Sequence, residues 1–444
     1  MPSFYHRRFY AFRGTRSYSW TACLVTSKAV QLSTRRSVFA SEISRPVILR
    51  AFCADLSLPR YNRSIKRNDW GPLRNLQMLP AYHLLASLVA RVFGPELWVL
   101  RGFSAFLAVL AIVLFHAAAR AYHADYGPYH LLRFAWNPLL LPLWVLVYTD
   151  MASLVGVLVA LNFHVRRRYV VAAAGLLLAC LIRQSNVIWV LFFLAWGVVE
   201  WRQAHRSARR AAGDASRAVA GEVPRTAHLV ALLPYGVLLL LAAGYSVLSG
   251  GLTETLREEN RPHANVAQFY MFALTAALLW APVWLPQLVQ LWPRRVEPAL
   301  VRPWVCAAVV TAIGVLELAF RNPHPWNLDL DYLRNWPLYW MTTHAAVRYA
   351  AAVVLVLFVP TLVQSTWVSP VRSVLGVLWA CTALFLLGHY LVDPRYYVVP
   401  FVLADFFAPR AAVPARRLAA WYLLLTLAVG AFIVGQPGGW RGVL

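Results

Sequence analysis

Long apolar runs, separated by short polar stretches, dominate the chain from about residue 97 to residue 436. A helix needs roughly 20 predominantly apolar residues to cross a hydrocarbon core of about 30 Å, and several runs approach that length. The pattern marks about twelve candidate spans: 97–118, 128–148, 150–164, 169–182, 187–200, 227–248, 265–291, 302–320, 347–363, 373–392, 396–408 and 418–436. We therefore predict an all-α, polytopic helical membrane protein with about twelve transmembrane helices.

Two stretches depart from a simple span. Residues 79–94 are apolar but too short to cross a bilayer comfortably, which predicts a helix lying in the membrane interface. The span 128–148 contains Pro138 and Pro142, which predicts a discontinuous helix packed inside the bundle.

Basic residues follow the third, fifth, seventh, ninth and eleventh spans, beginning with Arg166-Arg167-Arg168. If the spans alternate in direction, all of these arginines share one side of the membrane, which the positive-inside rule assigns to the cytoplasm. The opposite side, lumenal or periplasmic, then carries four polar segments: Asp150, residues 183–186, the connector 321–335 and the turn at Asp393.

Residues 1–75 differ from the rest of the chain. They carry 14 Lys+Arg against three acids, many serines and no clean span, and the protein's two lysines, Lys28 and Lys66, both lie here. An Arg- and Ser-rich transit segment fits this composition; so does a start assigned in the wrong place or frame, which the break in lysine usage favours. Either origin predicts a poorly packed or disordered segment, followed by a transmembrane domain over residues 76–440.

Composition narrows the partners. The chain is 60% hydrophobic with a formal net charge of +24. In a membrane protein, basic cytoplasmic loops beside anionic headgroups explain such a charge, so we expect membrane lipid and no nucleic acid as a partner. The sequence holds no Walker loop, GxGxxG or HExxH motif, and His83, His116 and His130 lack metal-ligand spacing. We expect neither a metal nor a cofactor.

The polar stretch Arg183-Gln184-Ser185-Asn186 interrupts two apolar runs and predicts a tight hairpin with an arginine at its tip. An arginine at membrane depth usually faces a polar partner or a water-filled cavity, although it can also cap a helix end or reach the headgroups. Asp150 is open to reading as a helix N-cap or as a ligand, and Asp393-Pro394-Arg395 as a local ion pair or as part of a site. Arginine forks suit a phosphate, so these residues together predict one polar site for a lipid-linked phosphate.

Several of these segments resemble the dolichol-pathway alpha-1,2-glucosyltransferase family, in an order preserved from about residue 76 to residue 408. Ile182-Arg183-Gln184-Ser185-Asn186-Val187-Ile188-Trp189-Val190 is similar to that family's Phe-Arg-Gln-Thr-Asn-Ile-Ile-Trp-Val, the most specific match. Leu79-Pro80-Ala81-Tyr82 resembles its Leu-Pro-Gly-Leu-Tyr, and Tyr148-Thr149-Asp150 with Ser153 resembles its Tyr-Thr-Asp/Glu…Ser. Asp393-Pro394-Arg395-Tyr396-Tyr397-Val398-Val399-Pro400 is similar to its Glu-Phe/Pro-Arg-Tyr-Phe-Ile-Ile-Pro. The connector resembles a His-Pro…Ala-Asp-Asn-Arg-His-Tyr loop more loosely.

The resemblance implies a GT-C glycosyltransferase with a lumenal site and a polyprenyl-phosphate sugar as co-substrate. It implies that Arg183, Arg334 and Arg395 bind the donor phosphate. It implies substrate contacts from a larger set: Asp150, Gln184, Asn186, His324, Asp329, Asp331, Tyr332 and Asp393. The family's general base is an acid in the first lumenal loop; residues 1–75 lack that motif, and Asp69 is the nearest stand-in.

The expected function is transfer of a hexose, glucose in an alpha-1,2 linkage, from dolichyl phosphate to the lipid-linked N-glycan precursor or another glycan acceptor. That places the protein in the endoplasmic reticulum, or in the inner membrane if the chain is a bacterial relative using an undecaprenyl carrier, which its arginine-rich usage also fits. The alternatives are a transporter or lipid flippase, which would favour an internal repeat that the sequence does not show, and a catalytically dead membrane protein without the first-loop acid.

Overall fold

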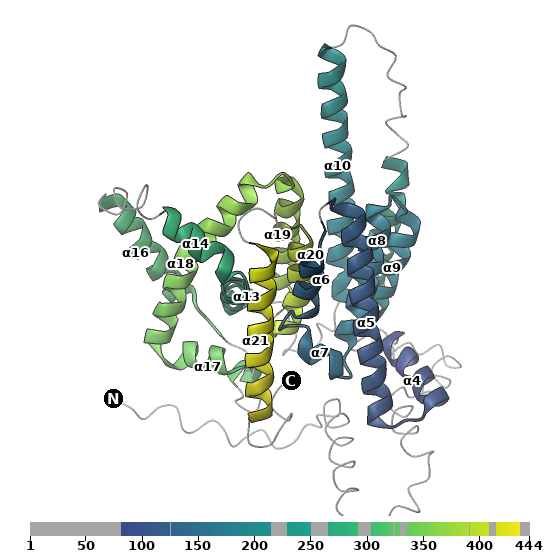
Figure 1. Cartoon of the computed structure of the whole chain (residues 1–444), viewed down its shortest axis with the longest axis horizontal. Coiled ribbons are helices and arrows are strands. Elements are labelled where there is room, and N and C mark those ends of the chain that lie inside the picture. Colours follow the sequence, from purple (N-terminus) through teal and green to yellow (C-terminus); the bar gives the residue numbers. More distant parts are fainter. Residues whose placement is uncertain are drawn as a thin grey trace, which may run out of the picture. The chain divides into compact units, whose positions relative to one another are not determined.

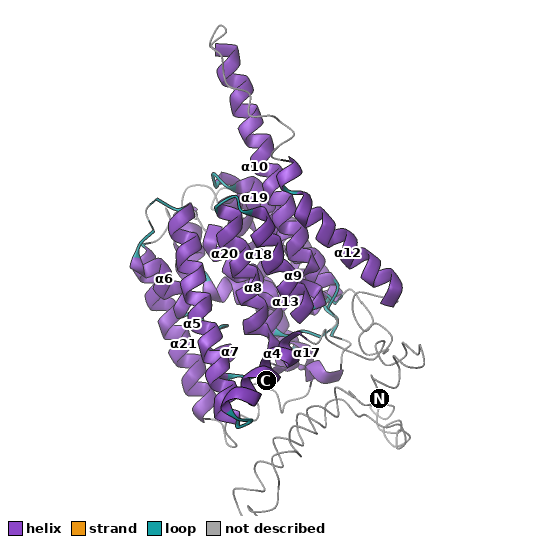
Figure 2. Ribbon diagram, turned by 90° about the vertical axis from the view of Figure 1, so that its right-hand side faces the viewer, coloured by secondary structure: helices purple, strands orange, loops and turns teal. Residues whose placement is uncertain are grey.

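The computed structural model describes residues 81–124, 126–214, 229–249, 265–291, 303–322, 325–328, 335–389, 391–407 and 414–435. Within these ranges the chain forms helices, turns and short connections and no strand, so the predicted all-α membrane fold is confirmed (Figure 2). The basic segment 1–75 lies outside the described residues, and the prediction made for it stays a prediction.

The helices follow one another in this order (Figure 1): α4 (Ala81–Phe93), α5 (Leu97–Tyr122), α6 (Pro128–Ala135), α7 (Leu141–Val145), α8 (Thr149–Val165), α9 (Tyr169–Ile182), η2 (Gln184–Asn186), α10 (Val187–Asp214), α12 (Leu233–Ser249), α13 (Val266–Leu279), α14 (Ala281–Leu291), α16 (Pro303–Ala319), η5 (Pro325–Leu328), α17 (Trp336–Thr343), α18 (Ala345–Val368), α19 (Arg372–Leu387), η7 (Pro394–Tyr397), α20 (Val398–Phe407) and α21 (Ala415–Gly435).

Four described helices are long and apolar enough to cross a membrane: Leu97–Tyr122, Gln184–Ser207, Ala345–Val368 and Ala415–Phe432. Val266–Leu279 and Ala281–Val289 make a fifth if the two, bent by 80° at their junction, count as one broken span. Other apolar helices are shorter, 10–17 residues. The predicted count of about twelve spans is therefore not confirmed.

The predicted break in the span 128–148 is present. Helix α6 ends at Ala135 and α7 begins at Leu141, with Pro138 in the turn between them. A proline has no N–H to donate to the preceding turn, so the helical ladder stops there. The Asn137 side chain accepts the backbone N–H of Leu139 at 3.0 Å and supplies part of the missing bonding.

Helix α8 packs against both α5 and α9 and is buried along most of its length. Its backbone comes unusually close to α9 at Gly156 and Gly175, where a Cβ added to either glycine would lie 2.9 Å from the carbonyl oxygen of the other. Small residues allow such close approach between membrane helices. A tight turn joins the two antiparallel helices, so the first residues of α8 lie beside the last residues of α9.

The bundle therefore has two chemically different ends. We call the end where α8 begins and α9 ends the Asp150 end, and the end with the α8–α9 turn the Arg166 end. Helix α10 extends beyond its neighbours at the Arg166 end in both views (Figures 1 and 2). Arg166 also donates to the carbonyl of Ala117 at 3.3 Å, which places the last turns of α5 at this same end.

Candidate functional site

Four charged side chains meet at the Asp150 end: Asp150, Arg183, Asp393 and Arg395, which we call the four-charge group. Asp150 is the second residue of α8, and Arg183 follows the last residue of α9. Asp393 and Arg395 belong to the turn that opens η7. Three segments far apart in the sequence thus contribute to one group.

Asp150 joins the group through both carboxylate oxygens. Its Oδ1 accepts a hydrogen bond from Nη1 of Arg183, and its Oδ2 lies 3.9 Å from Nη1 of Arg395. Asp150 is only 5% exposed, and water therefore screens these interactions weakly. The N-cap of α8 is Tyr148, so Asp150 is not the capping residue that its position in the sequence also allowed.

Asp393 holds Arg395 within a single turn. The Asp393 carboxylate accepts the Arg395 backbone N–H at 3.0 Å and the Arg395 Nε–H at 2.8 Å. Asp393 is 1% exposed. Such a pair of contacts, with Pro394 fixing the backbone between its partners, orients the guanidinium before any ligand arrives.

Aromatic rings cover both arginines. The Arg395 guanidinium lies 4.7 Å from the ring centroid of Tyr148, and that of Arg183 lies 5.4 Å from the ring of Tyr396. Arginine attracts the electron-rich face of such a ring, so these contacts restrict the guanidinium planes. Arg183 also ends α9, its backbone N–H donating to Ala179, so its role at a helix end and its contact with Asp150 coexist.

Asn186 fixes the hairpin tip to α8. Its Nδ2 donates to Oγ of Ser153 and to the carbonyl of Ala179, both at 2.7 Å. Gln184 lies half-buried in the same turn, but its side chain takes no part in the hydrogen bonds described for this group. The predicted tip residues therefore divide into Arg183, which reaches the four-charge group, and Asn186, which anchors the hairpin.

Burial and charge set the protonation states here. Burial lowers the pKa of Arg183. Burial also lowers the pKa of Arg395, but the charge and hydrogen bonds of Asp393 outweigh it and raise that pKa above its ordinary value. Arginine stays protonated in proteins, so both guanidinium groups are cationic. Burial lowers the pKa of His389 to about 4, which leaves this histidine neutral at pH 7; its Nδ1 donates to the carbonyl of Phe385 at 2.7 Å.

Two buried amide side chains position the segment before η7. Gln268 of α13 donates to the carbonyl of Leu391 at 2.8 Å and accepts the Tyr397 hydroxyl at 2.8 Å. Asn327 of η5 accepts the backbone N–H of Val392 at 3.1 Å. Sequence reasoning missed both residues. The available signal was a polar amide inside the apolar run 265–291, since such a group is costly to bury unless it is hydrogen-bonded.

The remaining predicted site residues lie outside the described residues: Asp69, His324, Asp329, Asp331, Tyr332 and Arg334. The described part of their connector nevertheless reaches the Asp393 turn, through the bond between Asn327 and Val392. In the ranges that the structure describes, no three His, Cys, Asp or Glu side chains lie close enough together to hold a metal ion.

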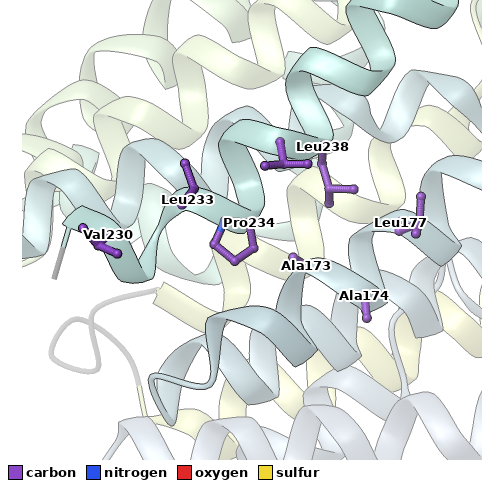
Figure 3. Close-up of a pocket in the computed structure, with 8 residues that line it drawn as sticks. Ala173, Ala174, Leu177, Val230, Leu233, Pro234 and Leu238 are labelled. Carbon is purple, nitrogen blue, oxygen red and sulfur yellow. The ribbon is translucent and has the colours of Figure 1, made fainter. Parts of the chain in front are cut away.

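An apolar groove of about 370 Å³ lies between α9 and α12, away from the four-charge group (Figure 3). Its lining is entirely apolar: Ala173, Ala174, Leu177, Val230, Leu233, Pro234, Val237 and Leu238. Such a lining offers no donor, acceptor or charge for a sugar or phosphate, so we place the candidate site at the four-charge group instead.

The fold and the site define a class, that of helical membrane proteins with arginine and carboxylate groups gathered at one end of the bundle. Within it, a family model matches residues 75–406, and the chain belongs to the DIE2/ALG10 family. All members of the four-charge group fall inside the matched residues. The family resemblance predicted from the sequence is confirmed.

The chain is similar to a curated protein of Arabidopsis thaliana, "Dol-P-Glc:Glc(2)Man(9)GlcNAc(2)-PP-Dol alpha-1,2-glucosyltransferase". The two are 26% identical over 353 residues, which covers 64% of this chain and 66% of the relative. The match thus spans slightly less than two thirds of the relative's length. No solved structure matches the chain significantly.

Proposed function

We propose that this protein is an integral-membrane glucosyltransferase that moves glucose from dolichyl phosphate glucose to a lipid-linked oligosaccharide in an alpha-1,2 linkage. Membership of the DIE2/ALG10 family and the likeness to the Arabidopsis enzyme support this proposal. The structural observation that carries it is the convergence of Arg183 and Arg395 on Asp150 at one end of the bundle. By analogy with the relative's dolichol-linked substrates, the membrane is that of the endoplasmic reticulum.

The two arginines would bind the donor phosphate. As the acceptor hydroxyl attacks C1 of glucose, the bond between C1 and the phosphate oxygen breaks, and dolichyl phosphate leaves with the bonding electrons. The acceptor proton passes to a general base, for which Asp69 lies outside the described residues. Guanidinium groups already oriented by Asp150 and Asp393 would stabilise the charge that develops on the leaving phosphate.

The carboxylate of Asp150 would contact the sugar. Its Oδ2 is buried and accepts no hydrogen bond from any described group. A buried carboxylate oxygen without a donor is costly, so a hydroxyl that reaches it gains a strong, charge-assisted hydrogen bond. We assign Asp150 to substrate binding on this basis, with Arg183 holding its other oxygen.

Transfer of radiolabelled glucose from dolichyl phosphate glucose to lipid-linked oligosaccharide by the purified full chain tests the proposal. Arg183→Ala and Arg395→Ala should abolish transfer and leave the protein folded by its melting temperature and elution profile. Arg202→Ala, which removes an exposed arginine of α10 at the Arg166 end, is the matched control and should retain activity. Full activity in both site variants would remove these arginines from the site, and an inactive wild-type chain would overturn the proposed reaction.

A further inference from the structure

A second ion pair connects α16 to α18. Oε1 of Glu317 accepts Nε of Arg348 at 2.7 Å and also accepts Nη2 of the same guanidinium. The two side chains are 13% and 20% exposed. The other carboxylate oxygen of Glu317 is buried and finds no hydrogen-bond donor in the part of the chain that the structure describes. The contacts described for Glu317 thus all go to Arg348, and the proposed reaction uses neither residue.

Arg348 also closes the end of α17. Its Nη1 donates to the carbonyl of Met341 at 2.8 Å and to that of Thr342 at 3.4 Å. The last carbonyls of a helix have no partner within the helix, and an arginine that bonds them stabilises that end. Since Glu317 holds the guanidinium, the ion pair determines where the last turn of α17 lies.

A chain of hydrogen bonds continues from that turn to the four-charge group. Asn322 donates to Oγ1 of Thr342 at 3.3 Å and accepts from the Asn327 side chain at 2.6 Å. The Asn327 carbonyl oxygen accepts the backbone N–H of Val392 at 3.1 Å. Val392 immediately precedes Asp393, whose carboxylate orients Arg395. Each link after the ion pair is a hydrogen bond, so the position of one partner restricts the next.

We propose that Glu317 and Arg348 are positioning residues for Arg395, acting through Thr342, Asn322 and Asn327. This inference rests on the proposed function in so far as Arg395 binds the donor phosphate. Asn327 is fully buried, and hydrogen bonds in such a setting are strong and polarise one another. Neutralising Glu317 releases Arg348 from its ion pair and lets the end of α17 relax. The relaxation then reaches the 391–395 segment, although neither residue of the pair touches the substrate.

Amide hydrogen exchange on the full chain in lipid nanodiscs tests this coupling without requiring activity. Glu317→Gln should accelerate exchange in the peptide covering 391–397 by about tenfold, within the usual range for coupling through a packed network. Peptides from α8 should exchange as in the wild type. Leu318→Ala is the matched control, because Leu318 is the next residue of α16 and is 82% exposed. Unchanged exchange at 391–397 in Glu317→Gln would overturn the proposal.

Kinetics give a second readout. Glu317→Gln should raise KM for dolichyl phosphate glucose about tenfold per folded molecule, and Glu317→Asp, which keeps a carboxylate, should restore part of it. A structural role alone would lower the melting temperature and leave KM unchanged. Thr342→Val breaks the chain at its middle while keeping the shape of the side chain, and it serves if Glu317→Gln does not fold.

The double variant Glu317→Gln with Thr342→Val completes the test. If the chain transmits position, the two effects on KM should not multiply, since the first change has already released the link that the second removes. Effects that multiply would contradict the chain. If the wild type transfers no glucose, the proposed function fails, while hydrogen exchange still decides whether the ion pair controls residues 391–397.

Discussion

At the scale of single residues, the two arginines of the four-charge group are held in different ways. Arg183 donates to Asp150 from one guanidinium nitrogen, whereas Arg395 uses Nε and Nη2 together on Asp393. A lysine can replace a single donor at one oxygen, but it cannot reproduce the flat fork of an arginine. The two positions should therefore tolerate lysine differently.

Arg395→Lys should lower kcat/KM for glucose transfer about ten- to a hundredfold, because a charge-assisted hydrogen bond contributes about 1.5–3 kcal/mol. Arg183→Lys should cost less, since it preserves the contact with Asp150. Initial rates at several donor concentrations measure both variants. The reverse order, with Arg183→Lys the more damaged, would show that Arg183 binds the phosphate through more than one donor.

His389 predicts a pH dependence of stability. Its ordinary pKa of 6.5 falls to about 4 in the folded protein because it is buried. The unfolded chain therefore takes up the proton first, so the contribution of the neutral ring to stability is complete above about pH 6.5 and is lost as the pH falls toward 4. Melting temperatures between pH 7.5 and 4.5 should decline less in His389→Gln, which keeps a donor for the Phe385 carbonyl. Parallel curves for variant and wild type would show that other groups cause the decline.

At the scale of elements, the close contact between α8 and α9 determines whether Asp150 and Arg183 can meet. Gly156 and Gly175 have no room for a side chain, because an added Cβ would lie 2.9 Å from a backbone oxygen of the facing helix. Any side chain there separates two helices whose opposite ends hold the site. A change far from the four-charge group should thus reach it by shifting a whole helix.

Gly156→Val should lower the melting temperature and reduce transfer activity, since overpacking of this kind typically costs about 1–3 kcal/mol. Gly244→Ala in α12 is the control, because an added Cβ meets nothing within 4 Å there. Thermal unfolding in detergent, followed by activity per folded molecule, separates the two effects. A Gly156→Val protein as stable as the wild type would mean that α8 and α9 can separate at little cost.

Sequence reasoning reached some of these elements and missed others for physical reasons. The prolines at 138 and 142 predicted the break between α6 and α7, because a missing N–H acts locally. Alternation of the spans put Asp150 and Arg183 on one side, but no local pattern indicated that Arg395 would approach Asp150 as well. The count of spans failed for a related reason: several apolar helices are short, and their status depends on packing that a sequence window does not contain.

At the scale of the whole molecule, the division of charge between the ends sets the orientation in the membrane. Arg166, Arg167 and Arg168 occupy one end, and the four-charge group occupies the other. Helix α19 agrees with this division, since it begins at Arg372 and ends just before His389, beside the site. The positive-inside rule then assigns the Asp150 end to the lumen.

Cysteine labelling in microsomes tests the orientation. An impermeant maleimide should label Arg202→Cys in intact vesicles, because α10 carries this exposed position toward the Arg166 end. Thr343→Cys, exposed at the end of α17, should react only after the membrane is permeabilised. Labelling of Thr343→Cys in intact vesicles would place the site on the cytosolic face and contradict a lumenal reaction.

The four-charge group is formally neutral, with two guanidinium groups and two carboxylates. A sugar phosphodiester carries one negative charge, whereas the phosphomonoester left behind carries up to two near neutral pH. A site built of arginines alone would therefore hold the spent carrier more tightly than the fresh donor and would stall after each cycle. Aspartates that compete for the same guanidinium groups weaken this trap, so the carboxylates matter as much for release as the arginines do for capture.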